Sequence, residues 1–277
     1  MADLPSANVP GVSHTAYLEH DGPIALAHRG FSTSGLENSM VAFQSAIDLG
    51  FRYLETDVHA TADGVLVAFH DASLDRVSDG TGVIGAMPWE QVAGARIGGT
   101  EQIPRLEEML HTWPQARFNI DIKSAGAIGP LVRVIERARA HDRVCVTSFS
   151  DARRRLAVRR LTRPVVTSAG QATTARFRMA AATFRDRPAA GIRRPAAAVR
   201  AALHDVDGVQ VPVRFRGVPV VTAQTVTAAH AAGRFVHVWT INDEAEMHRL
   251  LDLGVDGIVS DRADLLKGVL VARGQWS

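Results

Sequence analysis

Short apolar runs alternate with longer segments of helical periodicity along most of the 277-residue chain. Such runs, rich in Val, Ile and Ala, are typical of parallel strands that are buried on both faces. The runs predicted as main strands span 24–27, 53–58, 117–123, 144–148, 164–168, 208–211, 235–240 and 257–260. The segments predicted as helices span 40–49, 104–110, 129–140, 151–161, 173–203, 225–232, 244–253 and the residues from 263 onward. About eight strands alternating with helices over this length predict an α/β fold, a TIM (β/α)8 barrel.

A doubly wound sheet is the rival fold, but no GxGxxG motif follows the first strand to support a dinucleotide site. Neither a linker nor a break in composition divides the chain, so a single domain over 1–277 is expected, with 1–22 as a flexible N-terminal lead. Segment 173–203 is predicted to be one or two helices, because Pro188, Gly191 and Pro195 interrupt it.

Residues 71–103 break the alternation. Before them, Asp63-Gly64 between two apolar runs predicts a hairpin, so 65–70 is expected to be an extra strand. The segment itself is rich in glycine and polar residues, and a loop of this length is usually functional or an insertion. We therefore expect a small insertion after the second strand region that lies over the C-terminal rim of the barrel. A further short element is predicted at 218–221.

The composition is that of an ordinary globular protein, with 46% hydrophobic and 22% charged residues, which excludes a disordered chain. The formal net charge is only +2, so no nucleic-acid partner is expected. Arginines cluster at 153–163 and 176–200. The usual explanation is a solvated helix face; the alternative is attraction to anionic substrates or a lipid surface.

Cys145 is the single cysteine, so no intramolecular disulfide can form, and its apolar neighbours predict a buried, inert thiol. The N-terminal residues lack the features of a signal peptide. No apolar stretch approaches the ~20 residues that span a bilayer. A cytoplasmic protein without stable membrane insertion is therefore expected, and no pattern predicts its oligomeric state.

Chemistry-bearing residues follow or end the apolar runs of the first part of the chain. His28 and Arg29 stand at the end of the first strand, where parallel α/β folds place their sites. Glu55 and Asp57 lie two apart on the second strand, so both carboxylates point to one face. Two like charges on a buried strand repel each other unless a cation holds them. A metal site is therefore predicted.

On a barrel, further polar residues meet at the same rim. His70 ends the hairpin strand, Asp121 and Lys123 end the third strand, and Trp239 ends the seventh. Three carboxylates without cysteine predict a hard divalent cation, Mg²⁺ or Ca²⁺, rather than zinc. Arg29 and Lys123 beside them indicate an anionic small-molecule substrate such as a phosphate.

A series of motifs in order carries a resemblance to a known family. The motifs read HRG, ENS, ETDV, ADG, HDASLDRVSDGTG, IPRLEEML, NIDIK, VWTIN and GVDGIVSD, and extend from Ile24 to Asp261. The series resembles that of the glycerophosphodiester phosphodiesterase family. The resemblance implies a TIM barrel and an enzyme that hydrolyses glycerophosphodiesters, with a divalent metal, to glycerol 3-phosphate and an alcohol.

The resemblance also implies roles for single residues. His28 and His70 would be the acid/base pair, Arg29 and Lys123 would contact phosphate, and Trp239 would line the glycerol or alcohol pocket. Glu55, Asp57 and the acid of the NIDIK motif, Asp121, would hold the metal. Asp121 is one methylene shorter than the Glu usual in the family. The final SDRADLL motif also departs from the family pattern and is expected to be structural.

Several alternatives stay open at this point. Lys123 can pair simply with Asp121, and Trp239 can be core packing. Glu37 and Asn38 can help to order the site, but helix capping also explains Asn38 without any function. Asp71 either orients His70 or caps the insertion. The alternative functions are a lysophospholipase D-like lipid phosphodiesterase with the same site, and a noncatalytic phosphate-binding barrel.

Overall fold

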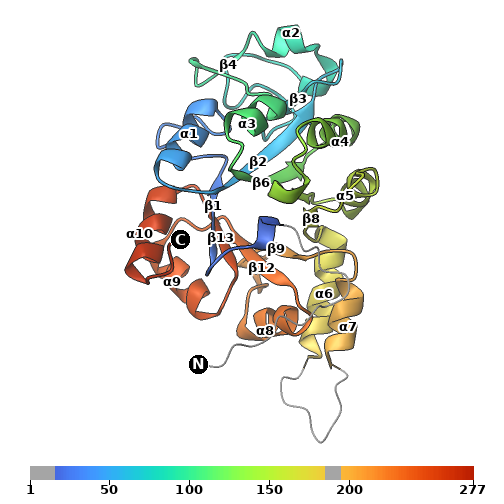
Figure 1. Ribbon diagram of the computed structural model, residues 1–277, viewed down its shortest axis with the longest axis vertical. Helices are drawn as coiled ribbons and strands as arrows, with labels where there is room; N and C mark the ends of the chain where they lie inside the picture. Colours follow the sequence, from blue (N-terminus) through green and yellow to red (C-terminus); the bar gives the residue numbers. More distant parts are fainter. Residues whose placement is uncertain (1–15, 185–194) are drawn as a thin grey trace, which may run out of the picture.

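The computed structural model describes residues 16–184 and 195–277. Eight parallel strands form a nearly closed barrel in the order β8-β7-β6-β2-β1-β13-β12-β9 (Figure 1). The strands are β1 (Ile24–His28), β2 (Tyr53–Ala60), β6 (Arg117–Ile122), β7 (Val144–Thr147), β8 (Val166–Thr167), β9 (Gly208–Pro212), β12 (Phe235–Trp239) and β13 (Gly257–Ser260). The predicted TIM-barrel fold is therefore confirmed, and the doubly wound alternative is wrong.

The barrel is bonded very unevenly around its circumference. β2 and β6 pair over six positions, from Tyr53 opposite Arg117 to Val58 opposite Ile122. β8 and β9 share a single parallel bridge, between Ser168 and Gly208. Closure there also requires glycine, because a Cβ atom on Gly208 would lie 2.4 Å from the Phe235 ring.

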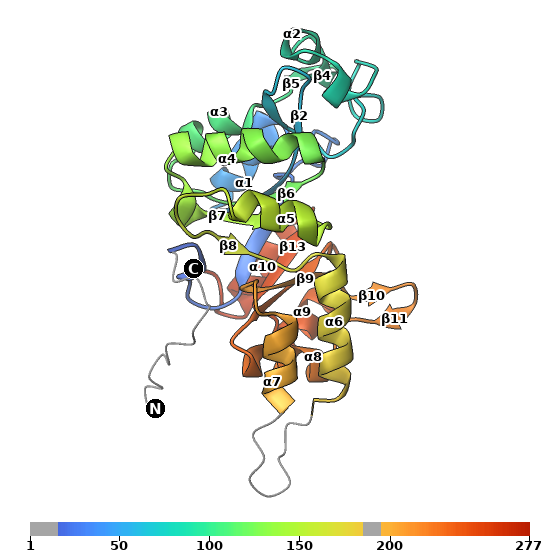
Figure 2. The ribbon, with the colours of Figure 1, turned by 90° about the vertical axis from the view of Figure 1, so that its right-hand side faces the viewer.

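Helices surround the barrel in the positions that the periodicity predicts (Figures 1 and 2). They are α1 (Met40–Asp48), α3 (Leu106–Thr112), α4 (Ile128–Arg137), α5 (Asp151–Val158), α6 (Gln171–Ala182), α7 (Pro195–Ala202), α8 (Ala223–Ala231), α9 (Glu244–Asp252) and α10 (Ala263–Ala272). α3 begins at Leu106 rather than at the predicted residue 104. The segment 173–203, predicted as one or two helices, contains two, α6 and α7. The predicted interruptions at Pro188 and Gly191 lie outside the described residues. Cys145 is buried as predicted, and burial raises the pKa of its thiol.

The arginines of α5 do not all belong to a solvated face. Arg154 is only 1% exposed, and its Nη2 lies 2.7 Å from the Asp205 carboxylate. The Arg153 guanidinium donates to the Lys123 carbonyl. The solvated-face explanation is therefore wrong for Arg154, because its charge is neutralised inside the protein rather than by water.

The segment 71–103 folds beyond the ends of β2 and β3 (Figure 1). The predicted extra strand is β3 (Leu66–Ala68), antiparallel to β2. After it come α2 (Trp89–Val92) and a small hairpin of β4 (Arg96–Ile97) and β5 (Glu101–Gln102). These elements enclose an apolar cluster of their own, made by Val67, Phe69, Leu74, Ile84, Val92, Ala95, Ile97 and Ile103. The segment is thus a packed structure rather than an open loop.

Two smaller elements complete the fold. The short element predicted at 218–221 is β11 (Val218–Pro219), which forms a hairpin with β10 (Arg214–Phe215) beside α6 (Figure 2). Residues 16–18 differ from the expected flexible lead: they form a 3-10 turn in which Tyr17 is buried, and its carbonyl accepts a 2.7 Å bond from the Tyr53 hydroxyl. Among the described residues, no helix is long and apolar enough to cross a membrane.

Candidate active site

A cavity of about 580 Å³ opens at the carboxyl ends of the barrel strands. All eight residues singled out from the sequence line it, namely His28, Arg29, Glu55, Asp57, His70, Asp121, Lys123 and Trp239. The register of neighbouring strands brings these residues together in pairs. His28 on β1 is opposite Glu55 on β2, and Asp57 on β2 is opposite Asp121 on β6. The predicted convergence at the rim is therefore present.

The turn after β1 is shaped to present Arg29. Arg29 adopts a left-handed backbone conformation with φ 56°, which non-glycine residues rarely adopt except where the surroundings enforce it. The next residue must be glycine, because a Cβ atom on Gly30 would lie 2.6 Å from the Ala42 carbonyl carbon. Close packing of α1 on this turn thus fixes the HRG motif.

Asp57 lies between two cationic side chains. Its carboxylate is 2.9 Å from Arg29 Nε and 2.8 Å from Lys123 Nζ, and it is only 2% exposed. Burial would raise the pKa of Asp57, but Lys123 and Arg29 hold that pKa below its ordinary value. Asp57 is therefore an anion in a site that carries balancing positive charge.

Glu55 and Asp121 are less well neutralised. Burial and the adjacent Asp57 carboxylate raise the pKa of Glu55, whose nearest cationic group is His28 Nε2 at 3.7 Å. Burial also raises the pKa of Asp121; one of its oxygens accepts from Lys123 at 2.8 Å, while Oδ1 has no hydrogen-bond partner among the described residues. Buried carboxylates with so little compensation are what an oxygen-coordinated cation would stabilise.

The same residues do not form a closed ligand set as they stand. Within residues 16–184 and 195–277, no three His, Cys, Asp or Glu side chains are grouped as metal ligands. The Lys123 ammonium lies instead within 2.8 Å of both Asp57 and Asp121. The ion pair between Lys123 and Asp121, left open from the sequence, is therefore formed.

Each of the two histidines is held by a carboxylate at Nδ1. His28 Nδ1 lies 2.5 Å from Asp261, and His70 Nδ1 lies 2.5 Å from Asp71. A carboxylate at one ring nitrogen fixes the ring orientation and leaves Nε2 for proton transfer. Burial would lower the pKa of His28, but Glu55 and Asp261 raise it above its ordinary value.

Known proteins resemble this chain in sequence and in fold. The model of the glycerophosphoryl diester phosphodiesterase family matches residues 28–265. The chain belongs to this family of enzymes. The resemblance carried by the motif series is thereby confirmed.

Two relatives and one solved structure illustrate the membership in the glycerophosphoryl diester phosphodiesterase family. The chain is 48% identical over 270 residues to "Probable glycerophosphodiester phosphodiesterase 2" of Mycobacterium tuberculosis, which covers 96% of this chain and 97% of that one. It is 27% identical over 257 residues to a glycerophosphodiester phosphodiesterase of Caldanaerobacter subterraneus, with coverage of 88% and 96%. A phosphodiesterase structure from Oleispira antarctica, in complex with the product sn-glycerol-3-phosphate, shares the fold with a TM-score of 0.73 at 24% identity, covering 90% of this chain and 97% of that one.

In this family member, sequence reasoning missed Asp261 as a site residue. It lies in the SDRADLL motif at the end of β13, which was expected to be structural, yet it contacts His28 directly. Asn242 holds the second oxygen of the Asp261 carboxylate at 2.7 Å. The signal that could have located Asp261 is its position at the carboxyl end of the last strand, beside the first.

An ionic chain also connects the insertion to the site. Arg76 contacts Asp71 at 2.6 Å and Glu37 at 2.7 Å, and Glu37 lies 2.9 Å from Arg29. Of the two roles that the sequence left open for Asp71, the contact with Nδ1 of His70 favours orientation of that histidine. Asp71 also joins His70 to Arg76 of the insertion.

Asn38 is not a helix cap. The N-cap of α1 is Ser39, whose hydroxyl accepts from the Ala42 amide. Asn38 instead accepts from Thr56 Oγ1 at 2.8 Å and has its amide nitrogen 3.4 Å from Asp57. The capping explanation is therefore wrong, because the helix begins one residue later and leaves Asn38 to support β2.

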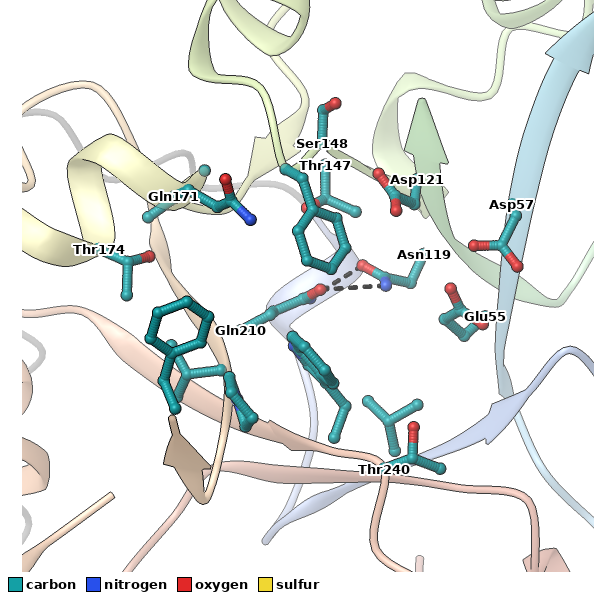
Figure 3. Close-up of a pocket in the computed structure, with 18 of the residues that line it drawn as sticks. Glu55, Asp57, Asn119, Asp121, Thr147, Ser148, Gln171, Thr174, Gln210 and Thr240 are labelled. Atoms are coloured by element: carbon teal, nitrogen blue, oxygen red, sulfur yellow. Dashed lines mark hydrogen bonds between the residues drawn. The ribbon is translucent and has the colours of Figure 1, made fainter. Parts of the chain in front are cut away.

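The phosphodiesterase cavity has an apolar wall as well as a charged end. Trp239 packs partly against the core and also faces the cavity, where its ring lies 5.7 Å from that of Phe149. At the centre of the site, Asn119 and Gln210 bond to each other through both amide groups (Figure 3). Both descriptions of Trp239, as core and as pocket residue, thus apply.

Proposed function

We propose that the protein hydrolyses glycerophosphodiesters to glycerol 3-phosphate and an alcohol. The observation that carries the proposal is the pair of carboxylate-held histidines, His28 and His70, at a cavity end that also presents Arg29 and Lys123. Two oriented imidazoles suit a reaction in which one proton must be removed and another supplied.

Binding of the substrate falls to the cationic side chains. A phosphodiester is an anion that repels nucleophiles, so positive charge must neutralise it as the transition state forms. Arg29 can donate to two phosphate oxygens through its planar guanidinium, and Lys123 provides a point charge beside it. Glu37 holds Arg29 at 2.9 Å and so restricts its orientation.

A divalent cation fits the remaining carboxylates. Glu55, Asp57 and Asp121 would hold it, and their oxygen-only donor set favours Mg²⁺ or Ca²⁺. When bound, the cation supplies further neutralisation of the phosphate charge. The unpartnered Oδ1 of Asp121 and the raised pKa of Glu55 support this assignment.

The histidines would divide the proton transfers. One imidazole takes the proton from the attacking oxygen, either of a water or of the neighbouring glycerol hydroxyl, as the new P–O bond forms. The other gives a proton to the alkoxide as the P–O bond to the alcohol breaks. If the glycerol hydroxyl attacks, the first product is a cyclic glycerol phosphate, and a water later opens its ring. Both routes therefore consume one water and yield the same products.

Steady-state kinetics test the proposal. Protein loaded with Mg²⁺ or Ca²⁺ should release glycerol 3-phosphate from glycerophosphocholine, and EDTA should stop the release. His28→Ala and His70→Ala should each lower kcat by roughly 10²- to 10⁴-fold, with a much smaller effect on ligand affinity. His111→Ala, at an exposed position of α3, is the matched control. A binding barrel without catalysis would show affinity for glycerol 3-phosphate and no turnover of any diester.

A lysophospholipase D-like activity is the second candidate, because much of the cavity wall is apolar. Phe149, Phe215 and Val220 all line it, and the first two are 46% and 55% exposed. A series of lysophospholipids of increasing acyl length separates the candidates. A lipid enzyme should gain kcat/KM with each added pair of methylenes, whereas an enzyme for water-soluble diesters should not.

A further inference from the structure

One half of the cavity lies away from the residues described so far. Glu55, Asp57 and Asp121 lie on one side, whereas Gln171 and Thr174 face the cavity from α6 on the other (Figure 3). The residues of α6 that line the cavity recur at helical spacing and thus share one face. They are Gln171, Ala172, Thr174, Ala175 and Arg178.

This α6 face carries a positive charge, that of Arg178, which no carboxylate of the described residues neutralises. Arg178 lines the cavity, and no described carboxylate lies within ion-pair distance of it, in contrast to Arg29 and Lys123. The carboxylates among the described lining residues are Glu55, Asp57 and Asp121, all on β2 and β6. As far as the described residues show, the α6 half therefore favours a negative group and offers no carboxylate to a positive one.

The neighbours of Arg178 on the helix suit the same ligand. Gln171 and Thr174 add an amide and a hydroxyl, and Gln171 to Arg178 extends about 10 Å along the helix axis at 1.5 Å per residue. Phe215 of the β10–β11 hairpin and Val220 add apolar lining to the same cavity. An extended polar strip in a cavity that also has apolar lining suits a flexible chain that ends in an anion.

We propose that the α6 face is the subsite for the alcohol arm of the diester and that Arg178 selects alcohols bearing a second anionic phosphoryl group. This inference rests on the proposed hydrolysis of glycerophosphodiesters. The glycerol arm is neutral and gains little from Arg178, whereas the reacting phosphate is bound at the opposite end by Arg29 and Lys123. Arg178 is thus a specificity-determining residue that is separate from the reacting atoms.

A pair of substrates that differ by one phosphoryl group tests the subsite. We would compare initial kcat/KM for glycerophosphoglycerol, whose alcohol is neutral, and bis(glycerophospho)glycerol, whose alcohol carries a second phosphodiester. Charge-assisted hydrogen bonds to Arg178 predict that the wild type prefers the second roughly 10- to 100-fold. Arg178→Ala and Arg178→Gln should abolish most of that preference, because they should lower kcat/KM far more for bis(glycerophospho)glycerol than for glycerophosphoglycerol.

Arg176→Ala is the matched control. Arg176 lies on the same helix, two residues away, and donates to Thr173, but it does not line the cavity. Its removal should leave both kcat/KM values unchanged. Arg178→Glu should reverse the preference and favour glycerophosphocholine, whose alcohol is cationic.

The outcomes separate this inference from the function on which it rests. No turnover of any diester by the metal-loaded wild type contradicts the proposed function. Turnover of both diesters with equal kcat/KM, or a ratio that Arg178→Ala and Arg178→Gln leave unchanged, overturns the role of Arg178 alone. A preference for long-chain lysophospholipids that is independent of Arg178 also overturns it.

Discussion

His28 and His70 are alike in the way they are held, although they come from different parts of the chain. Each places Nδ1 2.5 Å from a carboxylate, Asp261 for His28 and Asp71 for His70. Asp71 follows His70 directly in sequence, whereas Asp261 reaches His28 only because β13 lies beside β1. One support is therefore local and the other depends on barrel closure.

Replacing the long-range partner should affect chemistry more than stability. Asp261→Asn keeps the shape of the side chain but can donate to Nδ1, which favours the wrong imidazole tautomer. We expect kcat to fall by roughly 10²-fold or more, with thermal unfolding changed little. The pH–rate profile should also shift, which a purely structural role would not produce. Asp252→Asn, at an exposed position of α9 paired with Arg273, is the control, and an equal loss of kcat there would contradict the role of Asp261.

Asp121 provides a second residue-level prediction, on the metal. On the proposed metal assignment, Asp121→Ala should raise the dissociation constant for Mg²⁺ or Ca²⁺ by roughly 10- to 100-fold, because the substitution removes one of the three proposed carboxylate ligands. Asp121→Glu, which restores the family's longer side chain, should keep an affinity close to that of the wild type. Isothermal titration calorimetry measures both without recourse to activity. Unchanged affinity in Asp121→Ala would remove this residue from the ligand set.

The sequence predicted the residues that end strands, because the position of a strand end follows from an apolar run and period-two alternation. It did not predict the contacts that depend on distant segments. Asp261 was assigned a structural role, and the pairing of Arg76 with Glu37 spans 39 positions. Local pattern specifies which face a residue takes, whereas contacts between elements require the three-dimensional packing.

At the scale of elements, α5 shows how charge can be misjudged from composition. Its arginine run suggested a solvated face, yet Arg154 packs inward against Asp205 of the segment that follows α7. A helix periodicity that counts only apolar residues does not identify a buried arginine. The acidic partner lies 51 positions away, beyond the reach of any local pattern.

Removing this buried partner should be costly. Arg154→Ala removes the arginine from Asp151, whereas Asp205 keeps its pairing with Arg155, and the lost charged hydrogen bonds should destabilise the protein by about 1–3 kcal/mol. Urea denaturation followed by circular dichroism measures the difference. Arg160→Ala, at an exposed position just beyond α5, should change the free energy of unfolding by less than about 0.5 kcal/mol. Equal effects of the two substitutions would show that Arg154 contributes no more than a surface charge.

At the scale of the whole molecule, the barrel interior contains a histidine that stays neutral. His237 on β12 is fully buried and stacks on Phe235 with ring centroids 4.3 Å apart. Burial lowers the pKa of His237 to about 4. In the unfolded chain the His237 imidazole takes up a proton near pH 6.5, whereas in the folded protein it does so only near pH 4.

The protein should therefore lose stability in this pH interval. The contribution of the neutral His237 to the free energy of unfolding is fully present above pH 6.5 and is lost as the pH falls toward 4. The complete loss amounts to about 3 kcal/mol. In His237→Asn, the free energy of unfolding should fall less between pH 7 and pH 4.5 than in the wild type. His111→Asn, at an exposed position, should keep the wild-type dependence. Parallel pH dependences in the wild type and His237→Asn would contradict the prediction.

The single bridge between β8 and β9 has a consequence for how the enzyme can adapt. The strands that carry His28, Glu55 and Asp121 are joined by continuous ladders, whereas α6 and the β10–β11 hairpin follow the two strands at the weakly bonded join. Shifts at that join break few hydrogen bonds and leave the strands of His28, Glu55 and Asp121 in place. The proposed alcohol subsite can thus change shape while the proposed reacting residues keep their geometry.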